Sequence, residues 1–149
     1  MCIRDRSLPR VVTLAGGQLY QTPAPGLPAA VDATEHAMLW TGMCDIPAGS
    51  EVKVEIVDAA DNVCVTITHS GDQITVDRHD GDPASASLDD EDEDHISVLI
   101  DGSALEIFAG GGAVTFSSRF WPEVGATGLR VSTSGDARIL NQWRRGAAR

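Results

Sequence analysis

The hydrophobic residues of this chain alternate with polar ones in short runs, which Gly, Asp, Asn and Pro separate. Over 52–56 and again over 63–67 the residues alternate in this way, and a turn-forming segment, 58–62, lies between the two runs. A period of two is typical of strands that bury one face, and no long stripe with helical spacing competes with it. The two runs therefore predict a β-hairpin.

Similar runs along the rest of the chain predict further strands. They lie at 11–14, 18–21, 73–77, 129–131 and 137–143. After the second of these, Pro23, Pro25 and Pro28 predict a loop, since proline fixes φ and has no N–H to donate. Counted together with the strands between residues 95 and 122, the total is about nine strands, with turn residues every eight to twelve positions. This spacing predicts an all-β fold, a sandwich of two antiparallel sheets of the jelly-roll or lectin-like kind.

The most informative stretch is a predicted pair of hairpins between residues 95 and 122. Its strands are 95–100, 104–108 and 113–118, joined by turns at Asp101-Gly102 and Gly110-Gly111. A two-residue turn at the second position places Leu105 opposite Phe116, on an apolar face. The same register places Glu106 opposite Thr115 on the other face.

The balance of charge excludes two classes of partner. The chain has 22 acidic and 11 basic residues, a formal net charge of −11. Such a surface repels nucleic acid and anionic membranes, so we expect neither as a partner. No apolar run reaches the roughly 20 residues of a membrane-spanning helix. The acidic run 89–94 lacks the alternating spacing of a calcium loop and predicts a solvated loop.

Motifs for metal, cofactor or phosphate binding are absent from the sequence. The histidines lack the spacing of a metal site and are expected at the surface or in turns; they are His36, His69, His79 and His95. The three cysteines form no close pair, and the glycines at 110–112 lie between two strands rather than before a helix. We therefore expect no cofactor and no metal.

A catalytic pair of carboxyl groups is the remaining chemical possibility, because glycosidases hold two of them across a sugar. Asp101 and Glu106 are the candidate pair. Asp101, however, lies in a predicted turn, where it is expected to cap backbone amides. Glu106 lies in the middle of a strand, where an ion pair with a neighbour such as an arginine is the expected use. We therefore assign no catalytic residue.

Two stretches of the chain resemble the C-terminal module of glycoside hydrolase family 32, the family of invertases, levanases, inulinases and sucrose-6-phosphate hydrolases. The first stretch contains Leu8, Pro9, Arg10 and, in Gly17-Gln18-Leu19-Tyr20-Gln21, Tyr20. The second contains Asp101, Ser103, Glu106 and Phe108, then Gly112, and then Arg119 and Pro122 in Ser117-Ser118-Arg119-Phe120-Trp121-Pro122. Gly102, Gly110-Gly111 and Ser117 depart from the usual Arg, Asn-Asp and Thr of the family, but glycine still permits the turns.

The resemblance implies a longer enzyme in which catalysis and support belong to different domains. In that family catalysis belongs to a preceding five-bladed propeller with two Asp and one Glu in three short blocks, and none of these blocks occurs here. The implied parent is a retaining β-fructofuranosidase-type glycosidase. The implied role of this piece is an accessory sandwich that packs on its own N-terminal propeller. The resemblance leaves two further partners open. One is a fructose-containing saccharide, and the other is a second copy of the chain in a homodimer.

Other interpretations and the boundaries of the module stay open. A stand-alone carbohydrate-binding sandwich is the main alternative, with Trp40, Tyr20 or Trp121 exposed to stack on a sugar. An unrelated sandwich is the third interpretation. Residues 1–6 fit no element and are interpreted as a non-native leader before a module at 7–149. The sequence does not indicate the parent's substrate or its compartment.

Overall fold

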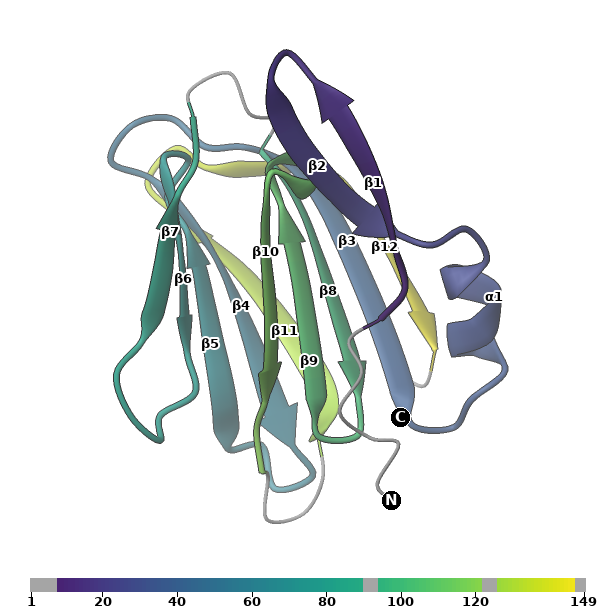
Figure 1. Ribbon diagram of the computed structural model, residues 1–149. Helices are drawn as coiled ribbons and strands as arrows, with labels where there is room; N and C mark the ends of the chain where they lie inside the picture. The colour runs from purple at the N-terminus through teal and green to yellow at the C-terminus, as the bar shows by residue number, and fades with distance from the viewer. Residues whose placement is uncertain (1–7, 90–93, 122–125, 147–149) are drawn as a thin grey trace.

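The chain is an antiparallel β-sandwich with an additional hairpin and helix on one side (Figure 1). The computed structural model describes residues 8–89, 94–121 and 126–146. Two five-stranded sheets face each other, so the predicted all-β, two-sheet fold is confirmed. No helix in these three segments is both long and apolar enough to cross a membrane.

Each sheet gathers strands from distant parts of the sequence. The first sheet has the order β10-β9-β8-β3-β12, with β10 Val114–Arg119, β9 Ala104–Ala109, β8 His95–Asp101, β3 Ala37–Asp45 and β12 Arg138–Gly146. The second has the order β11-β4-β5-β6-β7, with β11 Ala126–Ser134, β4 Glu51–Asp58, β5 Val63–His69, β6 Gln73–Asp77 and β7 Ala84–Ser87. The predicted hairpin over 52–67 is β4–β5.

The main core lies between the two sheets. It is made by the alternate apolar residues of each strand, as their period of two requires. Its fully buried members include Trp40, Ile56, Ile67, Ile96, Ile100, Leu105 and Ile107. Each such side chain stabilises the fold by about 1.5–3 kcal/mol through removal of its apolar surface from water. The acidic run that precedes β8 lies largely outside the described residues.

A third layer covers the outer face of the first sheet. It consists of the hairpin β1–β2 (β1 Arg10–Ala15 and β2 Gln18–Pro23) and the short helix α1, Leu27–Asp32. Leu8, Leu27 and Val31 pack there against Leu39 and Leu99, forming a second, smaller apolar cluster. The hairpin was predicted, but the loop expected after it is partly helical. Pro28 lies in the first turn of α1. Backbone N–H groups in the first turn have no acceptor within the helix, so a proline there costs no hydrogen bond.

The connection between β9 and β10 differs from the prediction. A 3₁₀ turn, η2 (Gly110–Gly112), takes the place of the two-residue turn, so Glu106 lies opposite Ser117 rather than Thr115. Three consecutive glycines with positive φ allow this wider turn. The register slip is two residues, so every side chain keeps its predicted face. Phe116 still packs on the core, although it lies opposite Ile107 rather than Leu105.

Candidate functional site

An ion pair joins the N-terminal hairpin to the first sheet. Nη2 of Arg10 on β1 lies 2.6 Å from Oε2 of Glu106 on β9, and the side chains are only 15% and 8% exposed. The Arg10 guanidinium also lies over the ring of Phe108, 5.3 Å from its centroid. A cation placed over an aromatic face is favoured by the quadrupole of the ring. Glu106 thus forms an ion pair with an arginine, as expected, and this arginine lies 96 residues earlier in the sequence.

Further hydrogen bonds complete this junction. Nη1 of Arg10 donates to Oε1 of Gln21 (3.0 Å) and to Oγ1 of Thr115 (2.9 Å), and Nη2 donates to Oγ of Ser117. Ser117 donates in turn to Oε2 of Glu106 (2.8 Å). The backbone N–H of Leu8 donates to Oε1 of the same carboxylate (3.1 Å). Both oxygens of Glu106 therefore have partners within the protein.

The hairpin also makes a close backbone contact with the turn η2. A Cβ atom added to Gly112 would lie 2.3 Å from the carbonyl oxygen of Gln21. Only glycine permits this approach, and the φ of +104° at Gly112 also favours glycine. The junction thus has a polar part around Glu106 and a close-packed part at Gly112.

The other motif residues lie around this junction or at the opposite end of β9. Pro9 accepts a hydrogen bond from Ala24 N–H (3.0 Å), and Tyr20 is half-buried on β2. At the other end of β9, Nη1 of Arg119 donates to Oγ of Ser103 (3.2 Å). Asp101 is exposed beside the turn. Pro122 lies outside the described residues.

The two candidate carboxyl groups share one face of the first sheet but differ in exposure, because Asp101 is exposed and Glu106 is buried. Asp101 and Glu106 lie on adjacent strands, and Asp101 is paired with Ala104, two residues from Glu106. Residues in that diagonal relation share one face of a sheet. Glu106, however, is buried, and its oxygens bond to Arg10, Ser117 and Leu8. A sugar cannot reach this carboxylate without displacement of the hairpin.

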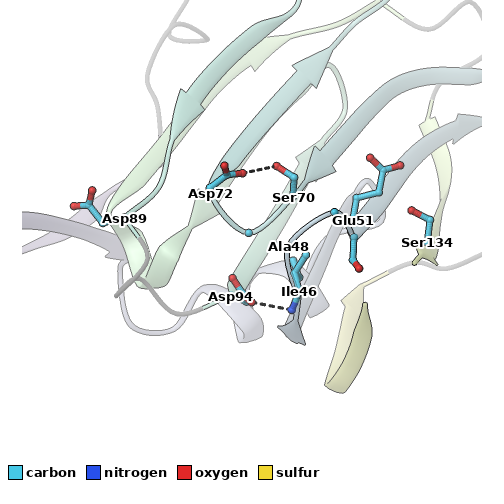
Figure 2. A pocket seen from close by; sticks show the side chains of 11 residues that line it. Ile46, Ala48, Glu51, Ser70, Asp72, Asp89, Asp94 and Ser134 are labelled. Carbon is cyan, nitrogen blue, oxygen red and sulfur yellow. Dashed lines mark hydrogen bonds between the residues drawn. The ribbon is translucent and has the colours of Figure 1, made fainter. Parts of the chain in front are cut away.

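A separate cleft of about 640 Å³ lies at one end of the sandwich (Figure 2). Its lining comes from connections that follow or precede several strands; it consists of Ile46, Ala48, Gly49, Ser50, Glu51, Ser70, Gly71, Asp72, Asp89, Asp94 and Ser134. Two of the carboxylates hold the surrounding backbone and side chains: Oδ2 of Asp94 accepts from the Ile46 N–H (2.9 Å), and Oδ1 of Asp72 accepts from Ser70 Oγ (3.0 Å). The sequence pattern did not indicate this cleft.

The described residues of the cleft provide neither a metal-binding group nor an aromatic platform. Among the described residues, no three His, Cys, Asp or Glu side chains are arranged to hold a metal ion. Aromatic residues are likewise missing from the described lining, so a sugar ring would find no surface to stack on. The hydroxyl and carboxylate groups of the lining make this cleft polar and acidic.

One histidine contradicts the expectation of surface or turn positions. His69 is buried at the end of β5, and its Nδ1 accepts a hydrogen bond from the Gly71 N–H (3.0 Å). Nε2 has no partner among the described residues. Burial lowers the pKa of His69, and the negative charges of Asp94 and Asp72 oppose that effect. The alternation that buries Val65 and Ile67 on β5 also buries His69, so the period of two was the signal for it.

The aromatic residues expected for sugar stacking are not brought together. Trp40 is 1% exposed and donates from Nε1 to Oε1 of Gln142 (2.9 Å), so the expectation of an exposed Trp40 is wrong. Its apolar ring fills the core because even-numbered residues of β3 face the second sheet. Trp121 is 73% exposed, and Tyr20 is half-buried on the separate hairpin.

Comparison with known proteins finds a family match over most of the chain and solved structures with a similar fold. Residues 46–144 match the family described as glycosyl hydrolases family 32 C terminal. No curated protein matches the chain by sequence. Similar solved structures include a β-fructofuranosidase of Bombyx mori (TM-score 0.65, 17% identity, 95% of this chain) and the sucrose-6-phosphate hydrolase of Lactobacillus gasseri (0.66, 17%, 93%). The chain spans only 33% of the length of either protein.

Proposed function

This chain belongs to the family of glycosyl hydrolase family 32 C-terminal domains, and from that membership we propose that it is the non-catalytic sandwich of a β-fructofuranosidase-type enzyme. Its role in this proposal is to pack against the enzyme's N-terminal catalytic domain and stabilise it. The substrate of the parent is sucrose or a fructan. Hydrolysis belongs to the part of the relatives that this chain does not span.

The observation that carries the proposal is that the carboxylate of Glu106 is bound within the protein. A glycosidase carboxyl group must reach the substrate, and the acid must be free to give up a proton. Glu106 instead binds Arg10, Ser117 and the backbone of Leu8 beneath the hairpin. In this proposal the carboxylate of Glu106 therefore holds the N-terminal hairpin on the sheet.

Activity assays test the catalytic half of the proposal. The purified 149-residue chain, incubated with sucrose, inulin or levan, is expected to release no fructose. The polypeptide encoded by the complete gene is the positive control. Release of fructose by the purified chain, at a rate that survives repeated purification, would overturn the proposal.

The stabilising half needs a separate measurement. In the complete polypeptide, deletion of the region that corresponds to this chain is expected to lower the melting temperature of the catalytic domain. An unchanged melting temperature would contradict a stabilising role. Calorimetric titration of the 149-residue chain with fructo-oligosaccharides is expected to show no heat, whereas saturable heat would favour a carbohydrate-binding module instead.

A further inference from the structure

The tip of the β1–β2 hairpin presents large apolar side chains to solvent. Val12, Leu14 and Leu19 are 59%, 69% and 58% exposed. Leu14 lies opposite Leu19, and Val12 lies two residues before Leu14. Since side chains two apart share a face, these three residues form one apolar surface. We call it the hairpin tip, and it includes the turn Gly16-Gly17.

The hairpin tip lacks the charges that normally protect such a surface. No charged residue occurs from Val11 to Val31, although 22% of the chain is charged. β1 and β2 form a separate two-stranded sheet, and neither of its edges pairs with another strand among the described residues. Natural proteins protect exposed edges with charges, proline or a covering element. The composition of the hairpin tip is therefore that of a covered surface.

The hairpin is also bound at its base to the first sheet and to η2. Arg10 binds Glu106 and Thr115 on the sheet, and Gly112 lies against the backbone of Gln21. Beyond these contacts the hairpin extends past the end of the sheet where β9 joins β10 (Figure 1). A surface that is ordered before binding loses less conformational entropy when it binds. This geometry suits the hairpin tip to docking a partner.

The surroundings of the hairpin tip indicate the charge of the partner. β3 and β9 both run antiparallel to β8, so they end at the same end of the sandwich. The cleft with Glu51, Asp72 and Asp94 follows β3 at that end, and the hairpin tip extends beyond β9 there. A partner that covers this end needs an apolar patch and basic side chains. A second copy of this chain, with a net charge of −11, would bring like charges together.

We propose that the hairpin tip docks the N-terminal catalytic domain of the same polypeptide. This inference rests on the proposed function and adds the surface through which this chain contacts the catalytic domain. About two thirds of the Bombyx mori and Lactobacillus gasseri proteins lie outside the match to this chain. A domain of ~300 residues has a radius of gyration on the order of 20 Å. β1, with six residues, spans roughly 20 Å, so a domain that precedes Leu8 reaches the hairpin tip.

Hydroxyl-radical footprinting tests the assignment. The oxidation rates of Leu14 and Leu19 are measured in the 149-residue chain and in the polypeptide encoded by the complete gene. We expect severalfold slower oxidation of both leucines in the complete polypeptide. Leu140 on the edge strand β12, 64% exposed in the isolated domain, is the matched control and is expected to keep its rate.

Paired variants of the complete polypeptide give a second readout. L14S/L19S is expected to split one thermal unfolding transition into two, and L140S is expected to leave one transition. Equal oxidation of Leu14 and Leu19 in both polypeptides would overturn the surface assignment, even where deletion of the module still destabilises the catalytic domain. Protection that is already present in the 149-residue chain and disappears on dilution would assign the hairpin tip to a second copy, which also overturns the proposal.

Discussion

The guanidinium of Arg10 and the carboxylate of Glu106 meet at 2.6 Å, although 96 residues separate them in the sequence. Both side chains are largely buried, so each charge depends on the other for compensation. The same carboxylate also accepts the N–H of Leu8. One side chain on β9 therefore binds both Arg10 and Leu8 of the N-terminal segment.

Removal of the charge of Glu106 should destabilise the domain. We expect Glu106→Gln to lower the free energy of unfolding by about 2–4 kcal/mol, because Arg10 is left as an uncompensated, mostly buried cation. Urea denaturation of both proteins measures this loss. Glu55→Gln is the matched control, since Glu55 pairs with Arg130 in a much more exposed ion pair whose loss costs ~1 kcal/mol or less. Equal denaturation midpoints for Glu106→Gln and the natural chain would disprove the role of the pair.

Replacement of Arg10 by lysine should cost stability even though the charge remains. The planar guanidinium reaches Glu106, Gln21 and Thr115 together, whereas one ammonium group cannot occupy all of these positions. We expect Arg10→Lys to lose roughly 1–2 kcal/mol. A double-mutant cycle that combines Arg10→Met, which removes the charge, with Glu106→Gln measures the coupling between the two residues. Strict additivity of the two losses would show that the side chains do not interact.

Two neighbouring glycines should respond differently to alanine. Gly111→Ala adds a Cβ that meets no atom within 4 Å, so only the positive φ opposes it, at about 1 kcal/mol. Gly112→Ala also brings Cβ to 2.3 Å from the carbonyl oxygen of Gln21. We expect a larger fall in melting temperature for Gly112→Ala, together with faster proteolysis of the hairpin. Similar melting temperatures for the two variants would contradict the close contact.

Stability should fall in mild acid because of His69. Burial lowers the pKa of this side chain in the folded state, so below pH ~6.5 the unfolded chain binds a proton that the folded chain does not. The free energy of unfolding then decreases as the pH falls from the unfolded pKa towards the lowered folded pKa, by up to ~1.4 kcal/mol per pH unit. In His69→Asn, whose Oδ1 can accept the Gly71 N–H, this part of the slope is expected to disappear.

The control for that measurement is His36→Gln, because His36 is exposed. Its profile of stability against pH should run parallel to that of the natural chain. Carboxylates contribute to the pH dependence of stability in the natural chain and in both variants. Their contribution cancels when the profiles are compared. Parallel profiles for the natural chain and His69→Asn between pH 5 and 7 would refute the assignment to His69.

Local pattern was sufficient to predict most strands and the class of fold. The alternation over 52–56, 63–67 and 73–77 corresponds to β4, β5 and β6, because each side chain's face depends only on its parity along the strand. β3 was not predicted: Ala37–Trp40 is a continuous apolar run, which is ambiguous between buried strand and helix. Both faces of β3 are covered, one by the second sheet and one by the N-terminal layer.

The sequence by itself determined the two-layer β architecture and the family resemblance, because both depend on periodicity and on short motifs within single segments. Only the tertiary structure decided which arginine pairs with Glu106, how the three glycines at 110–112 turn, and where the cleft and the hairpin tip lie. The physical reason is that these features join residues brought together by the order of strands in the sheets. Glycine accepts several turn geometries, and the turn observed is the one compatible with the close approach of Gln21 to Gly112.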